Sequence, residues 1–405
     1  MNPRYLFIIA SLLLVSACNT TTTPDFASDA ERIARESIII DTHVDVPYRL
    51  VSKPADISVA TDDGDFDYPR ARRGGLNAPF MSIYTPASLE AEGQSKAVAE
   101  TLIDTVLGFA EKWPDKFAIA TSPRDVRAQF QAGIMSLPMG MENGSPIEGN
   151  LDNLQHFFDR GIRYITLTHG LSNHISDSSY DDNHQWNGLS EFGRDAVQEM
   201  NRLGIMVDIS HVSDDAFWQT IEISKVPLIA SHSSARRFTP GFERNMSDEM
   251  IVALAKNGGV IQINFGSSFV TAKAREYVSA RSEASKRWLA ENPQYDEKDS
   301  RRLFHDIYAE EHGPLPFASL DDVLDHFDHV VAIAGIDHVG IGSDYDGVGD
   351  SLPVGLKDVS SYPNLIRGLL ERGYSEADIR KILGENLLRV WQDAENYAAT
   401  TSSKT

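Results

Sequence analysis

Short apolar segments recur along this chain, and helix-like stretches separate them. Seven apolar segments stand out, at 38–40, 134–139, 164–167, 205–209, 228–230, 260–265 and 339–342. The intervening stretches include 151–160, 191–203, 214–224, 248–256 and 320–334. Strands that alternate with helices predict βα units and a parallel sheet. Seven or more such units favour a closed (β/α)8 barrel of the TIM type over an open doubly wound sheet, and no Gly-x-Gly-x-x-Gly motif follows the first segment.

Histidines or acidic residues follow all but one of these segments. They are His43, Glu142, His169, His211, His232 and Asp344, and the segment at 260–265 is the exception. His43 forms a His-x-Asp pair with Asp45, and alternation along a strand places both side chains on one face. Functional residues of such barrels gather at the carboxyl ends of the strands. The pattern therefore predicts one shared site there, although for His43 alone a buried histidine hydrogen-bonded to an acid is the alternative.

This set of side chains suits divalent metal ions. Imidazole is typical of zinc sites, and a mixed set of histidines and carboxylates also admits manganese, cobalt or iron. Two ions need about six bonds from the protein and one shared carboxylate. Glu142 can bridge two ions because no charged partner lies beside it in the sequence. Cys18 is the only cysteine, which excludes a zinc site built from thiolates.

Eight short motifs, in a fixed order, resemble those of a known enzyme family. They are DTHVD at 41–45, GMEN at 140–143, TLTH at 166–169, DISH at 208–211, SHS at 231–233, RNxxD at 244–248, GSDYDG at 342–347 and GEN at 384–386. The chain is similar to the renal (membrane) dipeptidase family of binuclear zinc dipeptidases over most of its length. The resemblance implies a TIM-like barrel of the metal-dependent hydrolase type.

The resemblance also implies a set of metal ligands for two Zn2+ per subunit. His43 and Asp45 would bind one ion, and His211 and His232 would bind the other. Glu142 would bridge the two ions together with a water or hydroxide. Two zinc ions lower the pKa of a shared water, so that hydroxide exists near neutral pH.

Four further residues match the family's catalytic and substrate-binding positions. His169 would contact the scissile carbonyl and its developing oxyanion, and Asp344 would shuttle the proton. Arg244, flanked by Asn245, would bind the terminal carboxylate of the substrate, because a guanidinium pairs bidentately with a carboxylate. The alternative for Arg244 is an i,i+4 surface ion pair with Asp248.

The expected activity is zinc-dependent hydrolysis of dipeptides that have a free C-terminal carboxylate. The family implies tolerance of a C-terminal D-residue, cleavage of a β-lactam ring in some members, and a homodimer. One alternative is another binuclear barrel hydrolase, such as a lactonase, phosphotriesterase or deaminase. These usually have His-x-His on the first strand, whereas this chain has His43-x-Asp45. The second alternative is a zinc-binding lipoprotein without activity.

The first residues read as a bacterial lipoprotein signal. Arg4 precedes an apolar run at 5–15, which is too short to span a bilayer stably, and Val15-Ser16-Ala17-Cys18 resembles a lipobox. Lipidation of Cys18 would anchor the protein in the periplasm, and Asn19 argues for the outer membrane. The expected organisation is a signal peptide at 1–17, a flexible tether at 18–30, one barrel domain at 31–395 and a disordered tail at 396–405.

The net charge of the chain argues against nucleic acid as a partner, and one segment is dense in charged residues. The chain has 37 Lys and Arg against 59 Asp and Glu, a formal net charge of −22, which argues against nucleic acid and against a polybasic membrane patch. The segment from about 267 to 316 is dense in charges of both signs. We expect it to form a helical insertion in a βα loop, as a lid, an oligomer contact or a solvated excursion.

Overall fold

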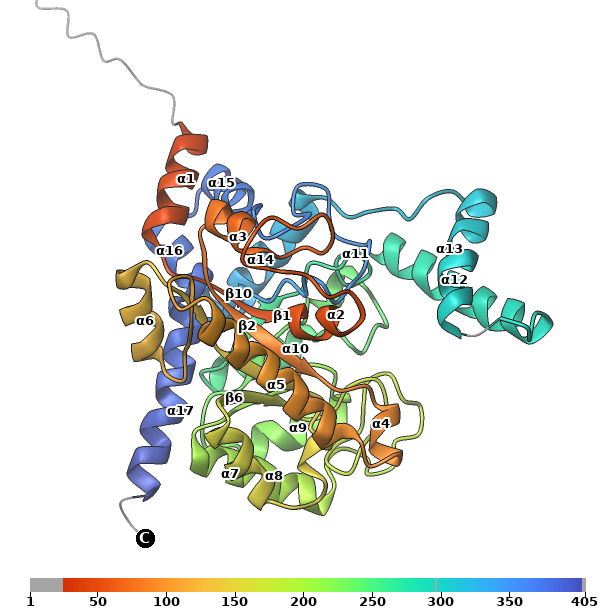
Figure 1. Cartoon of the computed structure of the whole chain (residues 1–405), viewed down its shortest axis with the longest axis horizontal. Helices are drawn as coiled ribbons and strands as arrows, with labels where there is room; N and C mark the ends of the chain where they lie inside the picture. Colours follow the sequence, from red (N-terminus) through yellow and green to blue (C-terminus); the bar gives the residue numbers. More distant parts are fainter. Residues whose placement is uncertain (1–24, 296, 403–405) are drawn as a thin grey trace, which may run out of the picture.

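The computed structural model describes residues 25–402 except residue 296, and Figure 1 shows their arrangement. The expected signal sequence and Cys18 lie outside the described residues. In the described part, no helix is long and apolar enough to cross a membrane.

Eight parallel strands form the barrel. In neighbour order they are β1 (Ile39–Val44), β2 (Leu76–Tyr84), β5 (Met139–Glu142), β6 (Ile162–Thr166), β7 (Met206–Asp208), β8 (Ile229–Ala230), β9 (Val260–Ile263) and β10 (Val339–Ile341). The first and last strands meet just beyond β10, where the amide of Asp344 donates to the carbonyl of His43 at 3.1 Å and the amide of Asp45 donates to the carbonyl of Tyr345 at 2.9 Å. The predicted (β/α)8 barrel is confirmed.

The observed strands differ from the sequence prediction in two places. β2 was not predicted, because Pro79 lacks the amide hydrogen that a central strand normally donates and so obscures the strand pattern. The single segment expected at 134–139 is two strands. β4 (Met135–Leu137) pairs with β3 (Phe117–Ile119) in a small separate sheet, and only β5 belongs to the barrel.

Helices cover the outside of the barrel (Figure 1). They are α1 (Phe26–Glu36), α2 (Val46–Ser52), α3 (Tyr68–Gly74), α4 (Ser88–Ala91), α5 (Ser95–Lys112), α6 (Pro123–Ala132), α7 (Asp152–Asp159), α8 (Glu191–Leu203), α9 (Asp214–Ile223), α10 (Asp248–Lys256), α14 (Leu320–Ala334), α15 (Tyr362–Glu371), α16 (Glu376–Arg380) and α17 (Asn386–Ser402). The bounds of α8, α10 and α14 agree with the sequence prediction, since serines at 190, 247 and 319 cap their first turns.

Both ends of the described chain are more ordered than the sequence suggested. The expected tether runs into α1, whose first turn is capped by the Asp25 side chain and whose Ile33 is buried. The expected tail at 396–405 is helical as far as Ser402. α17 closes the amino-terminal end of the barrel, because its buried Trp391 packs in one cluster with Phe80 and Tyr164 from β2 and β6. Both corrections arise from tertiary packing, which local composition does not reveal.

The charged segment after β9 is a helical insertion, as expected. A short helix, α11 (Ser267–Val270), leads into α12 (Ala272–Glu291) and α13 (Glu297–His312), which form a hairpin that projects from the barrel in Figure 1. The buried face of α12 consists of Ala274 alone. Aromatic rings hold the two helices together, with the centroids of Trp288 and Phe304 5.7 Å apart.

Candidate metal centre

The carboxyl ends of the barrel strands bring the predicted side chains together. His43 and Glu142 lie at the ends of β1 and β5, and the other residues lie in the loops that follow β1, β6, β7, β8 and β10. They line or adjoin a cavity of about 760 Å3, whose walls include Asp45, Glu142, His169, His211, His232 and Asp344. His169 is the most exposed of these histidines, with 23% of its side chain accessible, whereas His43 is fully buried.

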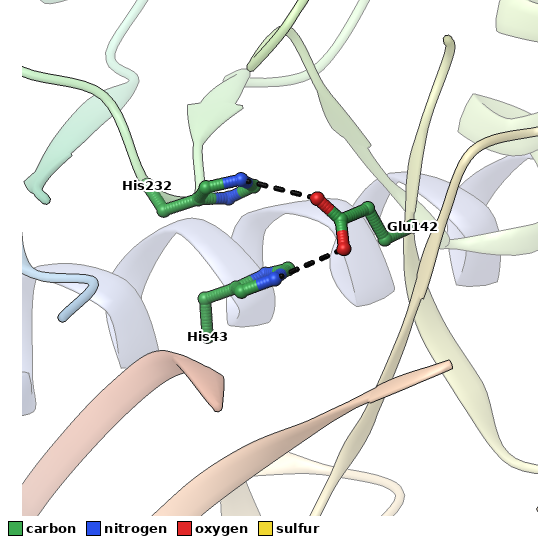
Figure 2. Close-up of side chains that lie close together, drawn as sticks. All are labelled: His43, Glu142 and His232. Atoms are coloured by element: carbon green, nitrogen blue, oxygen red, sulfur yellow. Dashed lines mark ion pairs between the residues drawn. The ribbon is translucent and has the colours of Figure 1, made fainter. Parts of the chain in front are cut away.

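Glu142 stands between His43 and His232 (Figure 2). Its Oε2 atom lies 3.3 Å from Nε2 of His43, and its Oε1 atom lies 3.3 Å from Nε2 of His232. The same Oε1 atom lies 3.2 Å from Nε2 of His211. On the first side, Oδ2 of Asp45 lies 3.5 Å from the same nitrogen of His43. The two oxygens of one carboxylate therefore face two separate sets of donors.

The donor set fits metal ions. Three overlapping triplets each bring ligand atoms within 4.8 Å of one another: His43, Glu142 and His232; Glu142, His169 and His211; and His43, Asp45 and Asp344. Nε2 of His43, Oδ1 of Asp45 and Nδ1 of His211 are buried without a hydrogen bond. Buried polar atoms normally have partners, so the unpaired Nε2 of His43 beside the carboxylates of Asp45 and Glu142 is what a metal centre requires.

Hydrogen bonds fix which nitrogen of His43 faces the cavity. The Tyr164 hydroxyl donates to the carbonyl of Thr42 at 2.9 Å, so it accepts from Nδ1 of His43, also at 2.9 Å. This contact orients Nε2 of His43 toward Glu142. A histidine whose second nitrogen is held in this way is pre-oriented as a ligand.

Asp208 orients His232 in the same manner. Its carboxylate accepts from the Ser231 hydroxyl at 2.6 Å, and that hydroxyl lies 2.7 Å from Nδ1 of His232. The same carboxylate accepts from the amides of Ser210 and Ser231 at 3.0 and 2.8 Å, and from the Thr166 hydroxyl at 2.5 Å. Asp208 therefore ties β6, β7 and β8 together directly beneath the site.

The electrostatics of the site also favour bound cations. Burial opposes ionisation of Glu142, yet His43 and His169 hold its pKa well below the usual range. Burial and nearby positive groups lower the pKa values of His211 and His232 well below the usual value, which keeps both imidazoles neutral, the form that binds metal. Burial also raises the pKa of Asp344 well above its usual value, although His43 opposes this shift.

Backbone strain gathers at the same place. His211 and Asp344 have φ values of 70° and 65°, and the neighbouring Asn143 and Asp346 have values of 74° and 67°. Residues other than glycine rarely occupy this left-handed region, and they persist there where the surroundings impose it, commonly at functional sites. The side chain of Asp344 is further fixed by the amide of Asn264, which donates to Oδ2 at 2.8 Å.

The predicted substrate-binding residues have different surroundings. Arg244 is buried and donates to the Ser233 hydroxyl at 2.7 Å and to the carbonyl of His232 at 2.8 Å, while its Nε atom has no hydrogen bond. The alternative of a surface ion pair with Asp248 is wrong, because Asp248 pairs with His329 at 2.7 Å.

Asn245 is engaged by its own loop. Its amide nitrogen donates to the Thr239 hydroxyl at 2.7 Å and to the carbonyl of Phe269 at 2.8 Å, and its oxygen accepts from the amide of Ser234 at 3.1 Å. These bonds hold the loop that carries Arg244. Contact between Asn245 and substrate remains a prediction.

Sequence reasoning missed the supporting residues Tyr164, Asp208 and Asn264. Tyr164 lies within an apolar strand segment, and Asp208 belongs to the DISH motif, from which only His211 has an expected role. Asn264 lies next to the last residue of the one segment that no histidine or acid follows, although Gln262 and Asn264 place two amides on one face of an apolar strand. That alternation was the available signal.

Known proteins that are similar to this chain include dipeptidases and metallopeptidases. The sequence model of the family described as membrane dipeptidase (peptidase family M19) matches residues 27–405. The chain is similar to the probable dipeptidase PvdM from Pseudomonas aeruginosa, at 26% identity and a TM-score of 0.80, over 92% of this chain and 99% of that one. It is also similar to a metallopeptidase from Rhodobacter sphaeroides bound to a phosphinate mimic of the dipeptide L-Ala-D-Ala, at 27% identity and a TM-score of 0.72, over 89% of this chain and 100% of that one.

These matches decide between the alternatives that the sequence left open. They place the chain with the dipeptidases and not with the lactonase, phosphotriesterase and deaminase barrels. The chain belongs to the membrane dipeptidase family, peptidase family M19, and is a metallodipeptidase.

Proposed function

We propose that this metallodipeptidase works with two zinc ions held at the strand ends and cleaves dipeptides that have a free C-terminal carboxylate. The observation that carries the proposal is the position of Glu142, whose two oxygens face His43 on one side and His211 and His232 on the other. One carboxylate shared by two sets of ligands is the usual arrangement of a two-metal hydrolase.

The residues divide into two ligand sets. His43 and Asp45 would hold one ion, His211 and His232 would hold the other, and Glu142 would serve both. When bound, two zinc ions polarise a carbonyl and lower the pKa of water so that it can attack near neutral pH. Every other part of the reaction is assigned to side chains of this chain.

Arg244 would position the substrate by its carboxylate. Its buried Nε atom has no hydrogen bond, and Phe269, which lines the cavity, lies beneath the guanidinium with 5.4 Å between the centres. A desolvated guanidinium with an unused donor forms strong charge-assisted bonds to a carboxylate. This requirement would restrict substrates to short peptides with a free C-terminus.

His169 would act on the carbonyl oxygen of the scissile bond, and Asp344 would act on its nitrogen. Nε2 of His169 lies 3.5 Å from Glu142, and its partly exposed ring forms part of the cavity wall, where it can donate to a developing oxyanion. Asp344 faces the same cavity, and its raised pKa suits a group that holds a proton from the attacking water and delivers it to the leaving amine.

We further propose that the enzyme accepts a C-terminal D-residue. The support comes from the similar Rhodobacter sphaeroides metallopeptidase, which was crystallised with a mimic of L-Ala-D-Ala. We also propose that the protein is a lipid-anchored, dimeric protein of the bacterial periplasm, which rests on the lipobox-like sequence before Cys18 and on the family resemblance.

Hydrolysis of a dipeptide panel tests the proposed function. The protein starting at Asn19 is assayed with L-Ala-D-Ala, L-Ala-L-Ala and the C-terminally amidated form of each, before chelation, after chelation and after zinc is restored. We expect cleavage of both free dipeptides, loss with chelation, recovery with zinc, and little cleavage of the amides. Efficient cleavage of the amides would remove carboxylate recognition from the proposal, and inactivity of zinc-loaded protein would reject it.

A further inference from the structure

One arginine in the wall of the catalytic cavity pairs with no carboxylate among the described side chains. Arg281 of α12 lines the same cavity as Glu142 and Asp344. Its guanidinium lies 5.8 Å from the centre of the Tyr277 ring, and among the described side chains no carboxylate pairs with it. Burial lowers the pKa of Arg281, and the groups that oppose this shift are the phenols of Tyr277 and Tyr308.

Arg244 and Arg275 likewise have no carboxylate partner among the described side chains, but neither of them lines this cavity. Acidic residues outnumber basic ones by 59 to 37, and the arginines of the barrel surface commonly find a carboxylate. Arg49 pairs with Asp346 at 2.9 Å, and Arg372 pairs with Asp328 at 2.5 Å. A partly buried guanidinium remains charged at neutral pH, so an unpaired one inside a ligand cavity is available to an anion of the ligand.

The position of Arg281 separates it from the proposed carboxylate site. Arg244 is anchored to the loop after β8 and sits behind Phe269, whereas Arg281 comes from the helical insertion and adjoins Val278 on the cavity wall. A cavity of about 760 Å3 is large enough for a small ligand that contacts both walls. The second contact would fall on a part of the substrate other than its terminal carboxylate.

We propose that Arg281 selects dipeptides with an acidic side chain, by pairing its guanidinium with the carboxylate of an aspartate or glutamate residue in the substrate. The inference rests on the proposed dipeptidase function and adds a substrate class to it. A neutral amide of the same shape offers the guanidinium only a weaker hydrogen bond. The preference should therefore distinguish glutamate from glutamine.

Matched substrate pairs test this selection in the zinc-loaded enzyme. kcat/KM is measured for L-Ala-L-Glu against L-Ala-L-Gln, and for L-Glu-L-Ala against L-Gln-L-Ala, in wild type, R281M and R281K. The control is R287M, because Arg287 lies on the exposed side of the same helix and does not line the catalytic cavity. All variants are checked for an unchanged unfolding midpoint and for metal content.

We expect wild type to prefer the glutamate member of one pair by about tenfold, the effect of one charge-assisted bond in a partly exposed site. R281M should lose that preference through a higher KM for the acidic dipeptide, with its neutral partner changed less than twofold. R281K should keep part of the preference, and R287M should keep all of it.

Two results would overturn the inference. One is hydrolysis of both pairs by wild type without preference for glutamate. The other is an equal loss of activity of R281M toward glutamate and glutamine dipeptides, which would make Arg281 a structural residue of the insertion. Failure of zinc-loaded wild type to cleave any of the four dipeptides is a different outcome, since it would reject the proposed function itself.

Discussion

The two walls of the catalytic cavity are built in contrasting ways. The barrel wall consists of strand ends whose side chains are buried and held by a second layer, as Asp208 holds His232 through the Ser231 hydroxyl. The opposite wall comes from α12, a helix whose buried face is Ala274 alone. The comparison indicates that the barrel fixes the chemistry, while the insertion adjusts which substrate reaches it.

The largest expected effect comes from the barrel wall. Asp344→Asn should keep both metal ions and lower kcat about 1,000-fold, because the amide cannot hold and deliver the proton. The side-chain amide of Asn264 should still donate to the side-chain oxygen of the asparagine that replaces Asp344. Steady-state kinetics and metal analysis on the same sample check the prediction. Loss of metal in this variant would make Asp344 a ligand and not a proton carrier.

The junction between the two walls should be sensitive to acid. His326 on α14 accepts from the amide of Ala235 at 3.0 Å, and its Nε2 atom lies 3.0 Å from the carbonyl of Val270, at the base of the insertion. Burial lowers the pKa of His326 to about 4, whereas the unfolded chain titrates near the usual value of about 6.5.

The unfolded state therefore binds a proton before the folded state does as the pH falls. The contribution of His326 to the free energy of unfolding is complete above about pH 6.5, and about 3 kcal/mol of it is lost by about pH 4. Denaturant unfolding between these pH values measures the slope. His326→Gln should reduce that slope by close to one proton, and an unchanged slope would show that other groups cause it.

Removal of the barrel-wall arginine that positions the substrate, Arg244, should raise KM. Arg244→Met removes the guanidinium but leaves an apolar side chain against Phe269. We expect KM for L-Ala-D-Ala to rise about 10- to 100-fold, which corresponds to one or two charge-assisted bonds, with kcat much less affected. A matched control is Arg236→Met, which removes a guanidinium that pairs with Asp214 nearby. Equal KM changes in both variants would argue for a general loop effect.

The smallest effect on global stability is expected in the insertion. Phe304→Ala removes a buried ring that packs on Trp288 and Tyr308 between α12 and α13. Hydrogen exchange should accelerate in the hairpin, while the unfolding midpoint of the barrel changes by less than about 2 °C. Phe80→Ala in the barrel core is the contrasting variant and should cost about 3–5 kcal/mol. A comparable global loss in both variants would mean that the hairpin and barrel unfold as one unit.

Much of the fold was predictable because its signals are local. The strands that end in a histidine or acid combine an apolar run with a polar end, and serine caps fix where α8, α10 and α14 begin. β2 was missed because Pro79 breaks the strand pattern. The helical end of the chain was missed because Trp391 is stabilised by contacts with distant strands.

The sequence predicts the residues that face the cavity of the candidate site, but not the residues that support them. Histidines and acids at strand ends stand out in the sequence, whereas Tyr164 and Asp208 look like ordinary strand residues until the barrel closes around them. Their roles depend on hydrogen bonds between segments far apart in the chain, such as that between Tyr164 and His43. Arg281 has no carboxylate partner among the described side chains, which likewise follows from its tertiary placement and not from its charged neighbours in sequence.

Metal stoichiometry tests the central claim most directly. Zinc-loaded protein is dialysed and its metal content is measured by plasma mass spectrometry, for wild type and for Glu142→Gln, with circular dichroism as the check on folding. The account predicts two equivalents of zinc per wild-type chain, and a folded variant that retains one equivalent or less together with little activity. A fully active wild type with a single equivalent, or a Glu142→Gln variant that keeps two ions and full activity, would contradict it.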